Sequence, residues 1–293
     1  TLTFAPTAGR AVNIGTAAAD ALTTSGLNFS TTEVGRIVNG WGSLVFGSTT
    51  AGALTNSRAS WSDPVSFITG NDFASTVGLT SADPILVQAV RDVLLTQTIA
   101  TTNTSATAII VSAGRNFINT AGANPLTTGA GGRWLVYSTN PTDTTGEETM
   151  SNAFNRYTCT YGGSCPTLST GNGLLYSYTP LLDVQIDPQS YNYGDAIIPP
   201  TGYTLQTSGY LNALDTSQGS VGGVGNFATS YVQGDNAGTS YTITNNGSTF
   251  ISNLGYGFNY VSPTGLTVGQ RQITVQVSDQ TRVYGNAPST SAY

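Results

Sequence analysis

The sequence predicts an all-β protein in which a solenoid of short parallel strands precedes a β-sandwich. The composition, a weak repeat in the first half of the chain and a clear repeat in the second half support this fold class. Only 8% of the 293 residues are charged, and 35 are Gly, whereas charged residues form roughly a quarter of ordinary globular domains. Thr, Val, Ile and Tyr favour pleated strands, and Gly, Asn and Pro favour the turns between them.

All nine basic residues are Arg, because the chain has neither Lys nor His. Without His it cannot build Ser-His-Asp or Cys-His catalytic groups, and without Lys it cannot form a Schiff base. The net charge of −6 disfavours nucleic acids and anionic membrane surfaces, which require clustered cations. We therefore expect neither an enzyme nor a nucleic-acid-binding protein. No apolar run reaches the roughly 20 residues of a membrane helix, so we expect no membrane span in this chain.

A short pattern recurs in the first half of the chain: a small residue, an Arg and then apolar residues. Spacings of 26, 55 and 24 residues separate Arg10, Arg36, Arg91 and Arg115. Periods of about 20–50 residues are typical of solenoids. Short strands between Gly, Asn and Thr turns fit a parallel β-helix with coils ~4.8 Å apart. We assign residues 1–145 to such coils, with chance similarity in a low-complexity sequence as the alternative.

The segment Asp83–Thr96, "DPILVQAVRDVLLT", has two interpretations. Asp83 as N-cap and Pro84 in the first turn would begin an amphipathic helix. The same residues also fit two strands separated by a kink, and the neighbouring sequence is β-like. The strand interpretation is favoured.

Cys159 and Cys165, in "CTYGGSC", are the only cysteines. Their spacing differs from the C-x-x-C of redox and zinc sites, and the Gly-Gly turn between them allows a small disulfide loop. A disulfide would stabilise the fold by roughly 2 kcal/mol and would indicate an oxidising compartment. Two free thiols are the alternative. We treat residues 146–183 as a cap or connector that contains this loop.

The second half of the chain contains a gapless repeat. The thirteen residues "VQIDPQSYNYGDA" from Val184 match "VQVSDQTRVYGNA" from Val275 at six identical positions, 91 residues apart. This spacing is a natural length for an immunoglobulin-like sandwich, and the intervening sequence alternates in hydrophobicity between turn signals. We therefore assign residues 184–274 to one such module and residues 275–293 to the start of a second.

Each repeat contains a Tyr-Gly pair with a predicted structural role. We expect Tyr193 to pack in the sandwich core or to fix a corner through its hydroxyl, with Gly194 and Asp195 forming a turn. Tyr284 and Gly285 are the matching pair in the second repeat.

These segments together resemble the large bacterial exoproteins of the filamentous-haemagglutinin type, which are exported by two-partner secretion. Gly132–Pro141, "GRWLVYSTNP", resembles a motif near the end of their β-helical shaft. Tyr193–Asp195 and Tyr284–Asn286 resemble the bacterial Ig-like repeats called MBG or YDG domains. The resemblance implies a right-handed β-helix, an outer-membrane transporter as export partner, and a role in adhesion or biofilm. It implies no catalytic residue.

The resemblance places Arg133 and Trp134 where the coils end. We expect Trp134, together with Leu135 and Tyr137, to close the open end as a hydrophobic plug. Arg133 would then bond to exposed carbonyls or to a nearby carboxylate. A sugar-stacking site is the alternative, because Trp and Arg also suit carbohydrate faces.

The densest acidic cluster is Asp143, Glu147 and Glu148, in "NPTDTTGEET". We expect a solvated loop there, with calcium binding as an alternative because hard cations prefer oxygen ligands. Asp187 and Asp195 are a second possible calcium pair. No cofactor is otherwise expected.

The sequence therefore predicts an extracellular, structural and adhesive segment of a bacterial surface protein. Its expected partners are surface glycans or proteins, or further copies of itself. A self-assembling filament subunit and a polysaccharide-binding β-helix are the alternatives. The first ten residues lack the basic and apolar regions of a signal peptide, so we expect any targeting segment to lie upstream.

Overall fold

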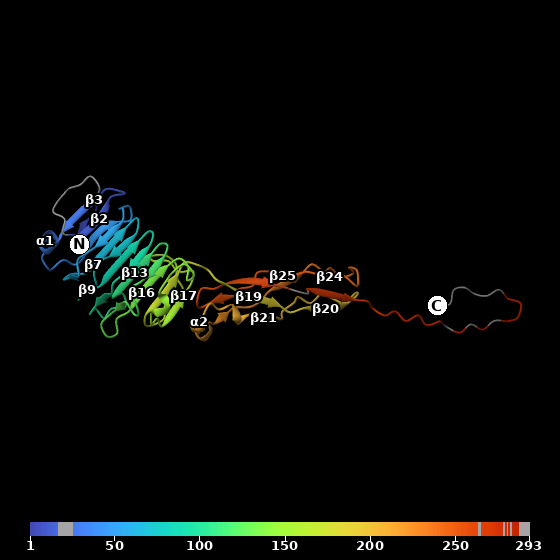
Figure 1. The fold of residues 1–293 in the computed structure, drawn as a ribbon. Helices are drawn as coiled ribbons and strands as arrows, with labels where there is room; N and C mark the ends of the chain where they lie inside the picture. Colours follow the sequence, from blue (N-terminus) through green and yellow to red (C-terminus); the bar gives the residue numbers. More distant parts are fainter. Residues whose placement is uncertain (17–25, 263–264, 278, 280, 282, 287–293) are drawn as a thin grey trace. The chain divides into compact units, whose positions relative to one another are not determined.

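The computed structural model describes residues 1–293 except 17–25, 263–264, 278, 280, 282 and 287–293 (Figure 1). The chain divides into two compact units. The first contains Thr1–Leu182, Thr207–Gly222 and Ile251–Phe258, and the second contains Asp183–Gln206, Gly223–Phe250 and Asn259–Tyr293. Each unit is described separately below.

Three parallel sheets, named A, B and C here, form the stacked coils of the first unit. Sheet A has eight strands in the order β1 (Leu2–Phe4), β4 (Leu44–Ser48), β7 (Val65–Thr69), β10 (Ile85–Ala89), β13 (Ile109–Ala113), β16 (Trp134–Ser138), β18 (Gly173–Tyr176) and β17 (Phe154–Arg156). Sheet B has six, in the order β14 (Phe117–Asn119), β11 (Val93–Leu95), β8 (Phe73–Ser75), β5 (Leu54–Asn56), β2 (Ala11–Thr16) and β3 (Gly26–Ser30). Sheet C has four, in the order β15 (Leu126–Thr127), β12 (Ile99–Thr101), β9 (Leu79–Ser81) and β6 (Ser60–Trp61).

The chain visits the three sheets in turn, so that each circuit forms one coil. In sheet A the aligned residues are Leu44, Val65, Ile85, Ile109 and Trp134, so successive coils take 20 to 25 residues. Every strand pairing in sheets A and B is parallel, as is every pairing in sheet C. The prediction of an all-β chain with parallel stacked coils is confirmed.

The Arg repeat reflects the coils only in part. Arg91 and Arg115 occupy equivalent turns before sheet B, where the Arg115 N–H donates to the Arg91 carbonyl at 2.9 Å. Arg10 holds the same position before β2. Arg36, however, caps the C-terminus of the short helix α1 (Thr31–Gly35). The 26-residue spacing from Arg10 to Arg36 is therefore not a coil, because this part of the chain pairs β3 beside β2 before returning to sheet A.

Asp83–Thr96 contains β10 and β11, which confirms the strand interpretation. Alternate residues of β10 are buried, starting at Ile85, while those between them are partly exposed. That two-residue period fits a pleated strand and not a helix.

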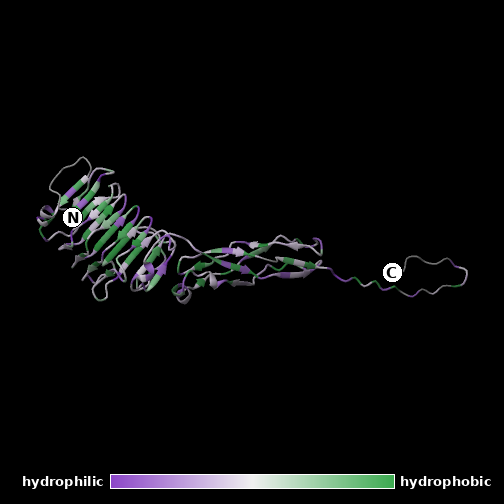
Figure 2. Cartoon of the chain, viewed as in Figure 1, coloured by the Kyte–Doolittle hydropathy of each residue, from purple (hydrophilic) through white to green (hydrophobic). Residues whose placement is uncertain are grey.

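The core of the first unit consists of buried apolar residues from the three sheets, and Figure 2 shows hydrophobic residues along the strands of the stacked coils. Aromatic rings stack from coil to coil: Phe4 and Phe46 lie 5.2 Å apart, and Phe46 and Phe67 lie 6.2 Å apart. Several inward polar residues at the corners have partners. For example, Asn56 Nδ2 donates to the Arg58 carbonyl at 2.9 Å and to Ser75 Oγ at 3.1 Å. The interior is therefore a packed core rather than a pore.

The coils continue beyond residue 145. Residues 146–183, predicted as a connector, contribute the 3-10 turn η1 (Glu147–Thr149) and then β17 and β18 of sheet A. The last strand, β17, is contacted by helix α2 (Ala213–Gln218). The turn η2 (Thr207–Gly209) and the antiparallel pair β22 (Val221–Gly222) and β26 (Ile251–Ser252) also belong to this unit.

Parts of the predicted sandwich module, 184–274, therefore belong to the coil unit. Residues 207–222 and 251–258 fold with the coils. The physical reason is burial, because Leu254 and Tyr256 pack in the same core cluster as Tyr157 and Tyr176.

The second unit is also all-β. One three-stranded sheet contains β21 (Tyr203–Leu205), β19 (Leu181–Ile186) and β27 (Gly257–Val261), and another contains β20 (Gln189–Asn192), β28 (Leu266–Gly269) and β24 (Ser240–Tyr241). A third pair contains β23 (Phe227–Thr229) and β25 (Ile243–Asn245). Strand β20 pairs with β28 in parallel, and β24 pairs with β28 antiparallel. Val184, Phe227, Ile243 and Leu266 are among its buried residues.

The described residues at the start of the second repeat form no strand. No described residue after Gly269 lies in a strand, and Ile273, Val275 and Val277 are exposed. These residues pair with no sheet in the described part of the chain. The Tyr284-Gly285 turn is present, with Gly285 at a φ of +96°.

Replacing Phe67 tests the packed core of the coils. The Phe67 ring is fully buried and lies 5.6 Å from the rings of Trp61 and Phe73. We expect Phe67→Ala to lower the free energy of unfolding by about 3–5 kcal/mol, measured by urea unfolding of the full chain. Ile68→Ala, on the outward side of the same strand, is the control and should cost about 1 kcal/mol or less. Equal losses in the two variants would contradict this assignment of faces.

Candidate functional site

An open groove crosses the outer face of sheet B. Its floor is a row of outward side chains at the middle position of successive strands: Thr55, Ala74, Leu94 and Ile118. They point outward because the residues before and after each of them are buried. Ala74 is the smallest of the four and makes the hollow, and the groove has a volume of about 220 Å³.

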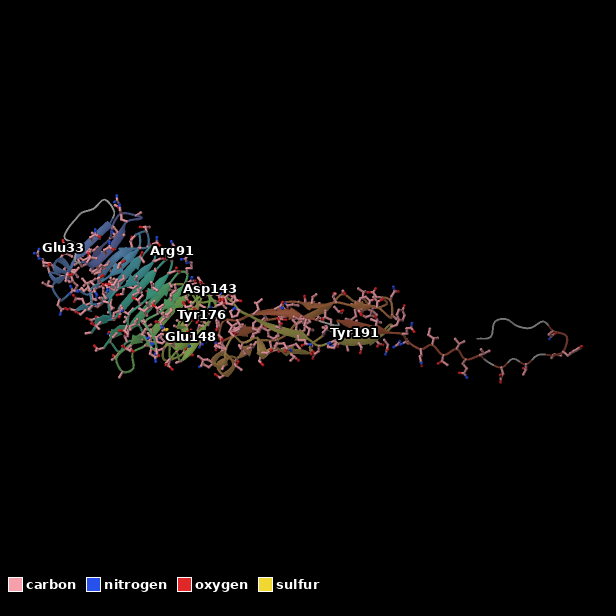
Figure 3. The ribbon with its side chains drawn as sticks, viewed as in Figure 1. Glu33, Arg91, Asp143, Glu148, Tyr176 and Tyr191 are labelled. Atoms are coloured by element: carbon pink, nitrogen blue, oxygen red, sulfur yellow. A yellow bond between two sulfur atoms is a disulfide. The ribbon has the colours of Figure 1, made fainter. Side chains whose placement is uncertain are left out.

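Ion pairs line one side of the groove. Asp72 Oδ1 accepts the backbone N–H of Asp92 at 3.1 Å, and Asp92 Oδ1 accepts that of Asn116 at 3.0 Å. Arg91 Nε lies 3.5 Å from Asp72 Oδ1. Arg115 holds Asp92 with two bonds, one of them from Nε to Oδ1 at 2.8 Å. Each Arg therefore pairs with the Asp of the preceding coil (Arg91 is labelled in Figure 3).

The ion pairs are preorganised and partly open to water. The Arg91 and Asp72 side chains are 47% and 43% exposed, and Arg115 is 49% exposed. The hydrogen bond from Arg115 lowers the pKa of Asp92, so that carboxylate stays ionised. The sequence pattern identified both Arg as repeat positions but not their Asp partners, because that pairing depends on coil register.

A row of hydroxyl groups follows the sheet B strands, at the end of the strands away from the ion pairs. One residue beyond each sheet B strand, successive coils carry Ser57, Thr76, Thr96 and Thr120. The Ser57 and Thr76 hydroxyl oxygens lie 2.8 Å apart, and Thr96 Oγ1 donates to the Ser75 carbonyl at 2.8 Å. The outward row that forms the floor of the groove thus lies between an ionic row and a hydroxyl row on the outer face of sheet B.

A second feature lies at the final coils, where Glu147 is partly buried. Tyr176 Oη donates to Glu147 Oε2 at 2.5 Å, whereas buried Oε1 has no hydrogen-bond partner among the described residues. Removal from water raises the pKa of Glu147 to about 7, against the opposing effect of the Tyr176 hydrogen bond. Of the predicted acidic cluster, Asp143 and Glu148 are exposed, as expected of a solvated loop, but Glu147 is not. Figure 3 labels Asp143, Glu148 and Tyr176.

Asp215, on helix α2, is the most deeply buried carboxylate in the described residues, at 1% exposure. Tyr157 Oη and Tyr256 Oη each donate to Asp215 Oδ2 at 2.7 Å, and Asn155 Nδ2 donates to Oδ1 at 2.9 Å. Burial also raises the pKa of both tyrosines, so their hydroxyls remain donors. Three donors therefore compensate the buried charge and join α2 to the last strand of sheet A.

Trp134 does not plug the end of the coils. It is 3% exposed and lies on β16, opposite Ile109, and two further strands follow β16 in sheet A. The end is covered instead by α2 and the tyrosines around Asp215. Because the Trp134 ring is buried, the sugar-stacking alternative is also wrong at this residue.

Arg133 bonds to carbonyls, one of its two predicted kinds of partner. Its Nε donates to the Ala106 carbonyl at 2.7 Å, and its Nη1 donates to that of Ser169 at 3.0 Å. It therefore links loops before and after its own coil.

Cys159 and Cys165 form the predicted disulfide. Cys159 is buried against Leu135, Phe154 and Leu175. The bond therefore fixes its loop to the outer side of the last sheet A strands.

The core-packing alternative for Tyr193 is wrong, whereas a turn is present at Gly194 as predicted. Tyr193 is 45% exposed, so its ring does not pack in a core. Gly194 has a φ of +82°. Asp195 accepts the Asn192 N–H at 2.9 Å and pairs with Arg271 at 2.8 Å. Tyr191, labelled in Figure 3, is the tyrosine whose hydroxyl fixes the corner, by donating to the Ile198 carbonyl.

Among the described residues, no group of three or more Cys, Asp or Glu lies close enough to hold a metal ion. In the same residues, no helix is sufficiently long and apolar to span a membrane.

Comparison with known proteins yields no match to any family model, curated protein or solved structure.

Glu147→Gln tests the buried carboxyl. The folded pKa of about 7 exceeds the ordinary value of 4.5. Protonation of Glu147 therefore stabilises the folded chain fully below pH 4.5, and this stabilisation is lost as the pH rises through 7. We expect Glu147→Gln to match the parent chain at pH 4.5 and to exceed its stability by about 2 kcal/mol at pH 8. Thermal unfolding at both pH values measures this.

The matched control is Glu148→Gln, which removes an exposed carboxylate next in the chain. Its stability relative to the parent should change little between the two pH values. A Glu147→Gln chain that is less stable than the parent at pH 8 would contradict the assignment.

Asp215→Ala tests the cover over the last coil. It leaves the Tyr157 and Tyr256 hydroxyls and the Asn155 amide without their shared acceptor, so we expect a loss of about 3 kcal/mol. Hydrogen exchange should increase first in residues 213–218 and 251–258. Asp143→Ala, in the exposed loop, should change stability by less than about 0.5 kcal/mol. Unchanged exchange in Asp215→Ala would show that other contacts hold the cover.

Proposed function

We propose that this chain is a structural and adhesive segment of a secreted bacterial surface exoprotein of the filamentous-haemagglutinin type. It acts at the outer cell surface, in adhesion or in the formation of biofilm or fibres, without catalysis. An outer-membrane transporter is its export partner. The coils of the first unit are taken as a right-handed β-helix, and the second unit as an Ig-like module of the MBG or YDG type.

The observation that carries this proposal is the outer groove on a solid stack of parallel coils. The interior is filled by stacked aromatic and aliphatic side chains, so binding groups are available only on the outside. A rigid scaffold with repeated outward rows suits attachment to an extended surface. The Cys159–Cys165 disulfide suits an oxidising, extracellular setting.

The Ig-like assignment of the second unit has two supports. Residues near both ends of the module are buried, such as Val184 and Leu266. The pairings β19–β21, β23–β25 and β24–β28 are antiparallel, as is typical of sandwiches, whereas β20 pairs with β28 in parallel.

A filament subunit is the second candidate, favoured by the exposed residues Ile273, Val275 and Val277. They alternate along the chain, and Val275 begins the sequence that repeats the strand residues from Val184. An alternating apolar segment of this kind can add to a sheet edge of another copy.

Beads coated with the purified, disulfide-intact chain test adhesion. We expect them to attach to bacterial biofilm and to bacterial or host cells more than beads coated with the heat-unfolded chain. Electron microscopy over a concentration series tests the second candidate, which requires regular filaments. Absence of both attachment and assembly would contradict the proposed function.

A further inference from the structure

We propose that the groove on sheet B binds a linear, neutral polysaccharide of the kind that forms extracellular matrices. The chain of sugars would run across the strands, with about one ring over each coil. This inference rests on the proposed adhesive function and names the chemistry of the partner.

The direction of the ligand follows from the hydrogen bonding of the sheet. Strands β5, β8 and β11 each have a parallel partner on both sides. Their backbone groups are therefore used within the sheet, and an incoming peptide strand finds no free backbone edge on this face. Only side chains are available, and equivalent side chains recur once per coil, ~4.8 Å apart. This spacing favours a polymer whose repeating unit is about as long as one sugar ring.

The three rows match the chemistry of such a chain. Ala74, Leu94 and Ile118 offer an apolar floor, hollowed at Ala74, to the C–H faces of sugar rings. The Asp and Arg row supplies both acceptors and donors for sugar hydroxyls, and Ser57 and Thr76 supply further hydroxyls on the other side. The hydroxyl row recurs on four successive coils, and the Asp–Arg pair occurs twice, one coil apart, which suits an unbranched polymer better than a branched glycan.

The charge balance favours a neutral ligand. Asp72 is paired with Arg91 and Asp92 with Arg115, so no cation at the groove is left to bind an anionic sugar. The chain as a whole has a net charge of −6, which opposes the approach of polyanions. Binding of a cation would likewise compete with the two-bond contact that Arg115 makes to Asp92.

Ala74 offers a specific test because it makes the hollow in the floor. Ala74→Arg would fill the groove from the outside without entering the core, since Phe73 and Ser75 on either side are the buried residues. Ala100→Arg is the matched control. Ala100 is the outward middle residue of β12 in sheet C, also between two buried residues.

Isothermal titration of the full chain with linear neutral hexose oligosaccharides of increasing length gives the readout. We expect affinity to increase with length until the groove is spanned. Ala74→Arg should weaken binding at least tenfold, while Ala100→Arg leaves it unchanged. Circular dichroism of both variants establishes that they are folded.

Other outcomes would overturn the inference. Preference for acidic oligosaccharides or for branched, sialylated host-type glycans would show that the charge and shape arguments fail. Equal loss in the two Arg variants, or no binding by the parent chain, would remove the groove as the site. If coated beads still attach in that case, the adhesive function stands and only the groove is rejected. If neither attachment nor binding occurs, both proposals fail.

Discussion

Each coil of the first unit depends on its neighbours for the hydrogen bonds of its strands and for the packing of its inward side chains. A strand of three residues, such as β8 or β11, has little stability alone, because ordering its backbone costs more free energy than its few hydrogen bonds contribute. Stacking in register solves this problem by placing like residues above one another, as with Phe46 and Phe67. Register is therefore the constraint on which the other features depend.

The outer face follows from the same constraint. Because the side-chain period of a strand is two, fixing Leu54 and Phe73 inward fixes Thr55 and Ala74 outward in a straight row. The turns before sheet B are aligned in the same way, which brings Arg115 over Asp92 of the preceding coil. The groove, the ion pairs and the hydroxyl row are thus consequences of a single register.

The last coil has no further coil to pair with, so another element must supply the hydrogen bonds and the burial that a neighbouring coil would provide. The last strand, β17, pairs with another strand on one side only. Without a cover, its other edge and the core beneath it would be open to water. The cover must therefore satisfy polar groups as well as bury apolar ones. Asp215 does this from α2 by accepting three hydrogen bonds, two from tyrosines that also pack in the core. At Glu147, removal from water raises the pKa towards neutrality, and the buried Oε1 has no hydrogen-bond partner among the described residues.

The sequence by itself determined the features that depend on local pattern. Composition and two-residue alternation predicted an all-β chain, and they predicted strands rather than a helix in Asp83–Thr96. Close spacing and a Gly-Gly turn predicted the Cys159–Cys165 bond. Only the tertiary structure decided which distant segments meet. It alone showed that Asp215 covers the coils, that Trp134 lies within them and that Tyr193 is exposed. The reason is physical: periodicity specifies which face of a strand is apolar, but burial of Asp215 and Glu147 depends on contacts between residues far apart in the chain, which no local pattern records.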